Sequence, residues 1–163
     1  MSFPSFAKIP SLMILLSILT ACQTLTLPSS TGLVSSENRL PFPEGQNSGA
    51  WKGNYLVVDY KYSRVVTGTD MTGTVTFREN MLMNFTSLTD FHLGVIFLDE
   101  NGKVIGRKGL TTWRGDLGQI PFRAEMGVPP ATASIAFTYE GTAIEGGGGD
   151  EGGGVTRFFQ YPG

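Results

Sequence analysis

Apolar and polar side chains alternate along several stretches of the chain. Small or apolar residues occupy every second position in 71–77, 120–126 and 135–139, and polar residues fill most of the positions between them. An alternation with a period of two is typical of a β-strand that buries one face and exposes the other. These stretches therefore predict three strands. Their inward-facing residues, together with residues of a fourth predicted strand over 91–98, form the predicted core. The predicted core residues are Val75, Phe77, Leu93, Val95, Phe97, Ile120, Phe122, Ile135, Phe137 and Tyr139.

The fourth strand, Phe91–Leu98, is apolar at nearly every position. A strand that is apolar on both faces is typical of the centre of a sheet. The residues Asp99-Glu100-Asn101-Gly102 predict a tight turn after it, because Asn-Gly tolerates the positive φ angles of a hairpin. The return strand is predicted over Lys103–Leu110, and further strands are predicted over Trp51–Tyr62 and Val155–Tyr161.

The pattern yields about seven short strands, with no amphipathic helix between them. Strands of this number, with turn signals at this spacing, favour two packed antiparallel sheets. We therefore predict an all-β fold, an immunoglobulin-like antiparallel β-sandwich, with a small β-barrel as the alternative. The stretch Val95–Ile105 also resembles the strand-turn-strand of small immunoglobulin-like sandwich domains of the cell envelope.

The N-terminal stretch is apolar and carries one charged side chain. Lys8 precedes an apolar run from Ile9 to Leu19, which is shorter than the roughly 20 residues that a membrane-spanning helix needs. The run ends in the sequence Leu19-Thr20-Ala21-Cys22. This stretch resembles bacterial lipoprotein signal peptides, whose lipobox consists of an aliphatic residue, two small residues and a cysteine.

The resemblance implies a lipid anchor on Cys22. In this family the cysteine thiol receives a diacylglycerol, the peptide is cut just before the cysteine, and the new amino group is acylated. Residues 1–21 are then a signal peptide. Gln23 stands where the family's inner-membrane retention signal has Asp, so the resemblance implies the outer membrane of a diderm bacterium. A buried structural cysteine is the alternative, which Pro4 and Pro10 disfavour because proline interrupts a short helix.

Residues 22–50 comprise the lipidated N-terminus and a predicted flexible tether. Proline, serine and glycine are frequent there, and no period of two or 3.6 is sustained. The sandwich domain is accordingly predicted over 51–163. Aliphatic residues at 25, 27, 33 and 34 leave open that part of the tether docks on the domain as an edge strand.

Composition excludes several classes of function. The 163 residues carry a formal net charge of −2 and only 16% are charged, so no basic surface for nucleic acid is expected. The single cysteine excludes an intramolecular disulfide, and the single histidine, His92, excludes a multi-histidine metal site. No hydrolase elbow, Walker loop or dinucleotide fingerprint occurs. We predict neither an enzymatic activity nor a cofactor, and interpret His92 as a structural or partly exposed strand residue.

Aromatic residues provide the candidates for a binding surface. Trp51, Trp113 and the neighbouring Arg114 are expected to contact a glycan or a protein partner, with ordinary core packing as the alternative for the aromatic rings. The aromatic cluster within 158–161 has the same two interpretations.

The glycine-rich segment 145–154 is the most unusual part of the composition. Glycine at this density cannot pack a side-chain core, which predicts a flexible hairpin loop between two strands. A Ca²⁺ loop is the alternative, because carboxylates and glycine carbonyls supply the oxygen ligands that calcium needs. Its weak ligand candidates are Glu145, Asp150 and Glu151, with Asp99 or Asp116 as additions.

Two hypotheses about function follow. The first is a lipid-anchored, non-catalytic module that docks on another envelope protein, and an exposed sheet edge or a flat apolar patch would favour it. The second is a surface module that binds a glycan or Ca²⁺, which a concave pocket lined by Trp51 or Trp113 would favour.

Overall fold

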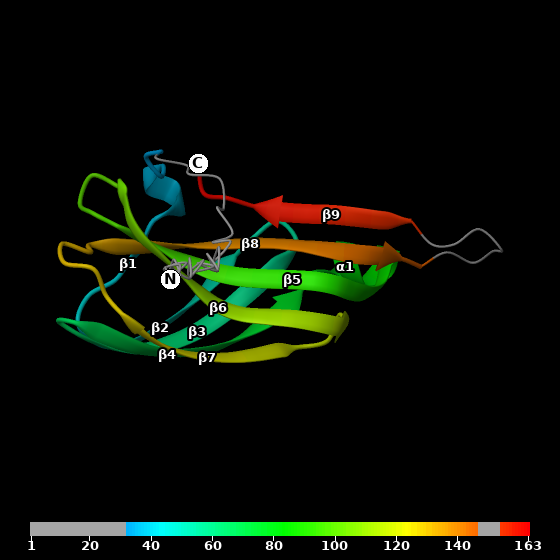
Figure 1. The fold of residues 1–163 in the computed structure, drawn as a ribbon, viewed down its shortest axis with the longest axis horizontal. Coiled ribbons are helices and arrows are strands. Elements are labelled where there is room, and N and C mark those ends of the chain that lie inside the picture. Colours follow the sequence, from blue (N-terminus) through cyan, green and yellow to red (C-terminus); the bar gives the residue numbers. More distant parts are fainter. Residues whose placement is uncertain (1–31, 147–153) are drawn as a thin grey trace, which may run out of the picture. The chain divides into compact units, whose positions relative to one another are not determined.

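A computed structural model of the chain describes residues 32–146 and 154–163. Within these residues the chain forms two antiparallel β-sheets that pack face to face (Figure 1). The predicted all-β sandwich is therefore confirmed. No ladder joins the two sheets within the described ranges, so the alternative of a small closed barrel is excluded.

The described residues contribute four strands to the first sheet, in the order β2–β3–β4–β7. Their bounds are Gly45–Lys52 for β2, Leu56–Val65 for β3, Gly68–Phe77 for β4 and Ile120–Gly127 for β7. The second sheet has β5 and β8 at its centre, β6 at one edge, and the short strands β1 and β9 along the other edge. Their bounds are Leu40–Pro41 for β1, Phe85–Leu98 for β5, Val104–Asp116 for β6, Ser134–Glu145 for β8 and Val155–Gln160 for β9.

The chain passes from one sheet to the other several times. The short helix α1 (Glu79–Asn84) leads from β4 into β5 of the second sheet, and the 3-10 turn η1 (Ser36–Asn38) precedes β1. After the β5–β6 hairpin, β7 returns to pair with β4, and β8 returns to pair with β5. The sequence analysis missed α1, because its 6 residues are too few for a helical period to show.

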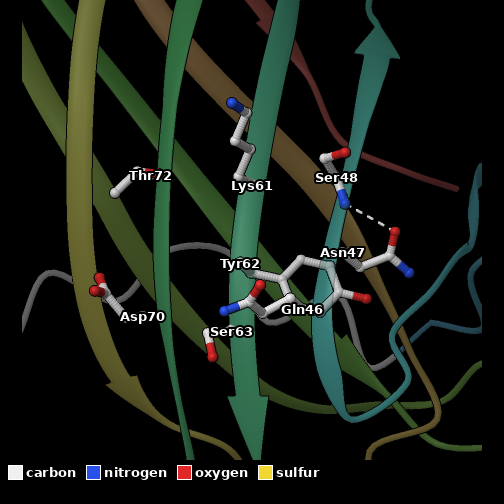
Figure 2. Close-up of a pocket in the computed structure, with 8 residues that line it drawn as sticks. All are labelled: Gln46, Asn47, Ser48, Lys61, Tyr62, Ser63, Asp70 and Thr72. Atoms are coloured by element: carbon white, nitrogen blue, oxygen red, sulfur yellow. Dashed lines mark hydrogen bonds between the residues drawn. The ribbon is translucent and has the colours of Figure 1, made fainter.

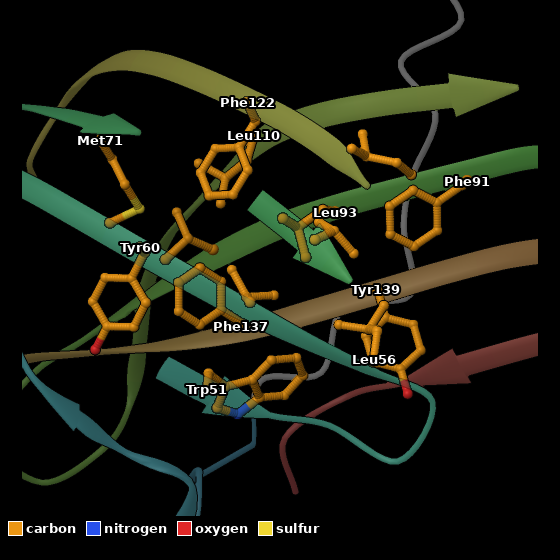
Figure 3. Packing of buried hydrophobic residues seen from close by; sticks show 14 of the residues in the cluster. Trp51, Leu56, Tyr60, Met71, Phe91, Leu93, Leu110, Phe122, Phe137 and Tyr139 are labelled. Carbon is orange, nitrogen blue, oxygen red and sulfur yellow. The ribbon is translucent and has the colours of Figure 1, made fainter. Parts of the chain in front are cut away.

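The core lies between the two sheets and is rich in aromatic side chains (Figure 3). All ten predicted core residues are buried there. Phe137 lies at the centre, with its ring centroid 5.6 Å from that of Trp51 and 5.2 Å from that of Tyr60. These tilted ring pairs join β8 of one sheet to β2 and β3 of the other, so the aromatic cluster holds the two layers together.

Tyr139 is buried beside this cluster and keeps its hydroxyl hydrogen-bonded. The hydroxyl donates to Oε1 of Gln160 at 3.1 Å and accepts the backbone N–H of Tyr55 at 3.3 Å. Burial raises the pKa of Tyr139 to about 12, because the phenolate would lose its hydration. The side chain is therefore protonated at physiological pH.

Gly73 leaves room for the ring of Phe122, which lies over the backbone of β4 in the first sheet. A Cβ atom at this position would lie 2.6 Å from Cζ of Phe122 and 2.3 Å from the carbonyl oxygen of Asp59. Phe122 is paired with Gly73 in the β4–β7 ladder, and its ring occupies the space that a side chain would take. Glycine is needed here for this close approach.

Strand β5 lies between β6 and β8, which confirms the prediction of a central strand, and its last four residues, Val95–Leu98, are buried on both faces. One face contributes to the main core. On the other face, Ile96 and Leu98 are covered by Val34 and Val104, which form a second small cluster with Ala136. The N-terminal segment around Val34 is therefore part of the fold.

The predicted boundary at residue 51 places too much of the chain in the tether. Leu33 forms a bridge with Lys103, Val34 donates its N–H to the carbonyl of Gly102 at 2.9 Å, and β1 and β2 belong to the sheets. Described residues from 33 onward thus take part in the sandwich, as the edge-strand alternative for Leu33 and Val34 anticipated. Residues 22–31 lie outside the described part of the chain.

The single strand predicted over Trp51–Tyr62 is wrong. The chain reverses there in a tight hairpin, in which Gly53 donates its N–H to the carbonyl oxygen of Leu56 at 2.8 Å. Strand β2 ends at Lys52 and β3 begins at Leu56. The signal for the turn was the dipeptide Gly53-Asn54, which favours a hairpin between two strands.

Candidate functional site

Two of the predicted binding residues, Trp113 and Arg114, lie on β6 beside a small surface hollow. The hollow has a volume of about 300 Å³, and β5 contributes its other wall. His92 of β5 is paired with Thr112 of β6, so both strands deliver polar side chains to the same place. The residues that line the hollow are Asp90, His92, Thr112, Trp113 and Arg114.

The chemistry of this hollow is mixed. Nε2 of His92 lies 2.9 Å from a carboxylate oxygen of Asp90, and His92 is a partly exposed strand residue, as predicted. The indole of Trp113 is 39% exposed, and its Nε1–H donates to the carbonyl oxygen of Asp116 at 3.1 Å. Arg114 is exposed and has no ion pair among the described residues. The exposed ring of Trp113 can stack on a sugar, and the guanidinium of Arg114 can pair with a carboxylate.

Trp51 does not belong to this site, so its interpretation as a surface binding residue is wrong. Its side chain is only 9% exposed and packs against Phe137 and Tyr139 in the core. The inward orientation follows from the strand alternation, because Trp51 is paired with the buried Val58 of β3. Core packing, the alternative interpretation, is what the structure shows.

The C-terminal aromatic cluster is divided between the core and the surface. Phe158 is buried, whereas Phe159 is 57% exposed and packs on Tyr161 with a centroid separation of 5.9 Å. Tyr161 donates its hydroxyl proton to Glu140 at 3.0 Å, and burial, followed by this carboxylate, raises the pKa of Tyr161. The cluster therefore offers a single exposed ring rather than a stacking platform.

The carboxylates of the predicted Ca²⁺ loop are only partly described. Glu145 is exposed at the end of β8 and accepts a hydrogen bond from Thr156 at 2.7 Å, while residues 150 and 151 lie outside the described ranges. Asp99 accepts the N–H groups of Asn101 and Lys103, both at 2.9 Å, in the β5–β6 turn at the other end of β5. Within the described residues, no group of three or more acidic, histidine or cysteine side chains forms a metal site.

Sequence reasoning missed the feature that the structure exposes most fully, the open edge of β2. Residues Gly45–Ala50 are all exposed, and β2 pairs only with β3 among the described residues. The pairing with β3 is regular from Gly45 to Lys52, with no bulge. We call residues Gly45–Lys52 with their unpaired side the β2 edge.

The backbone groups of the β2 edge can be assigned from the hairpin. Gly53 is hydrogen-bonded to Leu56, and in an antiparallel ladder the inward and outward N–H groups alternate along the strand. Lys52, Ala50, Ser48 and Gln46 therefore direct their N–H and C=O groups away from β3. The N–H of Ser48 accordingly donates to the side-chain Oδ1 of Asn47 at 2.8 Å (Figure 2).

Other sheet edges in the described residues carry protective features that residues Gly45–Ala50 of the β2 edge lack. Strand β6 has Arg107, Lys108 and several register shifts, β7 has Pro121 and Arg123, and β9 has Arg157 at its centre. Charges, prolines and bulges all discourage a further strand from pairing. Residues Gly45–Ala50 contain no charge and no proline, so the β2 edge is open to another strand.

Two shallow hollows lie beside the β2 edge, and Figure 2 shows the first of them. Their volumes are about 430 and 640 Å³, and both are lined by Ser48, Lys61 and Thr72. Asp70 adds a carboxylate to the first hollow and Asp59 adds one to the second. The edge is thus accompanied by a polar surface with both signs of charge.

No helix among the described residues has the length and apolar character needed to cross a bilayer. Comparison of the chain with protein-family models, with curated proteins and with solved structures finds no significant match. The function therefore has to be inferred from the residues themselves.

Proposed function

We propose that this chain is a lipid-anchored protein of the cell envelope that binds a protein partner through the β2 edge and catalyses no reaction. The observation that carries the proposal is the regular, uncharged and exposed strand Gly45–Ala50 at the edge of an otherwise protected sandwich. An exposed sheet edge is a template for a strand of another chain, which adds main-chain hydrogen bonds along its length.

The lipid anchor is argued from the sequence Leu19-Thr20-Ala21-Cys22 at the end of a short apolar run. Each buried CH₂ group of an acyl chain contributes about 0.8 kcal/mol, and two or more chains make the attachment lasting. The residue after the cysteine is Gln23 rather than Asp, which supports the outer membrane as the site of attachment. Strand β2 lies close to the anchor along the chain, so its partner would also belong to the envelope.

The chemistry of the β2 edge indicates the kind of partner. The outward-directed residues Gln46, Ser48 and Ala50 are small or neutral, so a second backbone can approach them closely. Its side chains would lie over the polar hollows, where Lys61, Asp59 and Asp70 can pair with charges of either sign. An extended polar segment of a partner, rather than an apolar helix, fits this surface.

A photoreactive amino acid in place of Ser48 tests the proposal in native membranes. We expect it to form an adduct with one envelope protein, and a photoreactive residue in place of Arg123 to form none. Arg123 is a suitable control because it lies on β7, at the opposite edge of the same sheet. The adduct should disappear when Ala50→Pro is added, because proline blocks the edge without removing a hydrogen bond to β3. Equal adducts at both positions, or an adduct insensitive to Ala50→Pro, would contradict edge pairing.

The Trp113 hollow supports a second candidate function, the binding of an envelope glycan. We expect Trp113→Ala to weaken binding of an oligosaccharide about tenfold, because a lost ring contact costs on the order of 1 kcal/mol. Isothermal titration with envelope oligosaccharides measures the effect, and Phe159→Ala is the control, since that ring is also exposed on the second sheet. Binding that is unchanged in Trp113→Ala would exclude the hollow as the glycan site. Ca²⁺ binding by segment 145–154 stays a prediction.

A further inference from the structure

One end of the sandwich carries two adjacent loops without any charged residue. The first is the β3–β4 turn, residues 66 and 67 with the flanking strand ends 65 and 68, and the second is the β7–β8 connection, residues 128–133. They are joined by a hydrogen bond from the N–H of Val128 to the carbonyl oxygen of Thr67 at 3.1 Å. We call the two loops together the apolar tip; they lie at the left end of Figure 1.

The apolar tip exposes side chains that turns normally avoid. Val65 is 60% exposed and Val66 is 71% exposed, and Pro130 and Ala131 are exposed in the neighbouring loop. Hairpin turns favour glycine, asparagine and aspartate, whereas β-branched residues fit the extended strand. Val65 ends strand β3, where a β-branched residue is ordinary, whereas the exposed Val66 lies in the turn itself and needs an explanation other than turn formation.

The apolar tip is held in place by an arginine behind it. Nη2 of Arg64 donates to the carbonyl oxygen of Thr132 at 2.9 Å, and the guanidinium also donates to the carbonyl of Phe42 and lies over its ring. Arg64 thus links β3, the β7–β8 connection and the segment before β2. The two valines are presented on a fixed surface.

The chain from Cys22 enters the described fold at this same end. Leu33 forms its bridge with Lys103 next to the β5–β6 turn, and the β7–β8 connection meets the end of β5 through the hydrogen bond from Ala133 to Leu98. Eleven residue steps separate Leu33 from Cys22. A chain of that length spans at most about 40 Å when fully extended.

We propose that the apolar tip contacts the surface of the bilayer that holds the lipid of Cys22, with Val65 and Val66 entering the headgroup region. The proposal rests on the lipid anchor of the proposed function. Two valines alone bind a membrane too weakly to attach a protein, but the anchor makes the contact intramolecular and so raises the effective concentration. Uncharged loops avoid the cost of desolvating a charge at that surface.

The opposite end of the sandwich provides a matched control. Helix α1 exposes Met83 to 76%, close to the value for Val66, and it lies at the right end of Figure 1. The two positions thus share an exposed apolar residue and differ in their distance from the point where the chain enters. If the membrane contacted every exposed apolar side chain equally, positions 66 and 83 would be equally close to it.

Site-specific fluorescence in vesicles tests the proposal. The acylated full-length mature chain would carry Val66→Cys or Met83→Cys, labelled with an environment-sensitive dye. Cys22 is the chain's single cysteine, and its sulfur, bonded to diacylglycerol in the lipidated chain, offers no free thiol to compete for the dye. The vesicles consist of phosphatidylcholine with a small fraction of lipid that is spin-labelled near the headgroup. We expect quenching at position 66 to exceed that at position 83 by about threefold or more.

Two results would overturn the inference, and they are distinguishable. Equal quenching at both positions, or stronger quenching at position 83, in a chain shown by mass to carry fatty acid would overturn the orientation and leave the anchor intact. A native chain without fatty acid on Cys22 would overturn the anchor and the orientation together. A tip that binds another protein instead of lipid would give the first of these results.

Discussion

The variant Cys22→Ser is expected to retain residues 1–21 and to incorporate no fatty acid, because serine offers no thiol for the diacylglycerol transfer that the lipobox implies. The effect should be complete rather than graded, since in bacterial lipoproteins cleavage follows the transfer of diacylglycerol to the thiol. It is the largest change expected from any single substitution in the chain.

The two measurements are incorporation of labelled palmitate in cells and the mass of the purified protein. Sedimentation with membranes is a poor readout, because an uncleaved precursor keeps the apolar run from Ile9 to Leu19. Ala21→Gly is the matched control, since it keeps a small residue before the cysteine and should be processed normally. A Cys22→Ser protein that is cleaved like the wild type would refute the lipobox assignment.

The variant Phe137→Ala is expected to lower the free energy of unfolding by about 3–5 kcal/mol, the usual cost of removing a buried phenylalanine ring. Phe137 is fully buried and its ring contacts Trp51 and Tyr60 of the opposite sheet, so the cavity would open between the two layers. Domains of this size are typically stable by about 5–15 kcal/mol, so the variant would be close to unfolding.

Urea unfolding followed by tryptophan fluorescence measures this loss. Phe159→Ala is the matched control, because Phe159 is 57% exposed on the neighbouring strand β9 and should change the free energy of unfolding by less than about 0.5 kcal/mol. Similar losses in the two variants would mean that the ring of Phe137 does not join the sheets as described.

The alternation of side chains predicted the sandwich and its core, because most strands bury one face against apolar neighbours. The same criterion failed for β2. Its inward positions include Gly45, Asn47 and Gly49, so no apolar alternation exists before Trp51. The core contacts come from the partner strand instead: a Cβ on Gly49 would lie 2.7 Å from the hydroxyl oxygen of Tyr60, whose ring covers that face. A strand covered by its neighbour's side chains leaves little periodicity in its own sequence.

The candidate sites were predictable to different degrees. Trp113 and Arg114 lie on the surface as expected. Their proximity to His92 and Asp90 depends on the register between β5 and β6. That register shifts between Leu93 and Gly94, and no residue pattern predicts the shift. The outward orientation of a tryptophan near a strand end cannot be read from composition, and Trp51 faces the core. The β2 edge escaped notice because its openness depends on which strands pair elsewhere.

The position of β2 immediately after β1 determines how tension would travel through the molecule. If the proposed lipid anchor on Cys22 and the proposed partner on β2 were pulled apart, the force would act on residues 23–45. In the described part of that path the resistance comes from Leu33, Val34 and the two β1–β8 pairs, followed by the guanidinium of Arg64 at Phe42. Once these contacts break, strands β3 to β9 carry none of the force between residue 22 and β2. The segment from Leu33 to Pro41 could therefore detach from β5 and β8 under load. The connection between Cys22 and the two sheets would then lengthen while the sheets stayed folded.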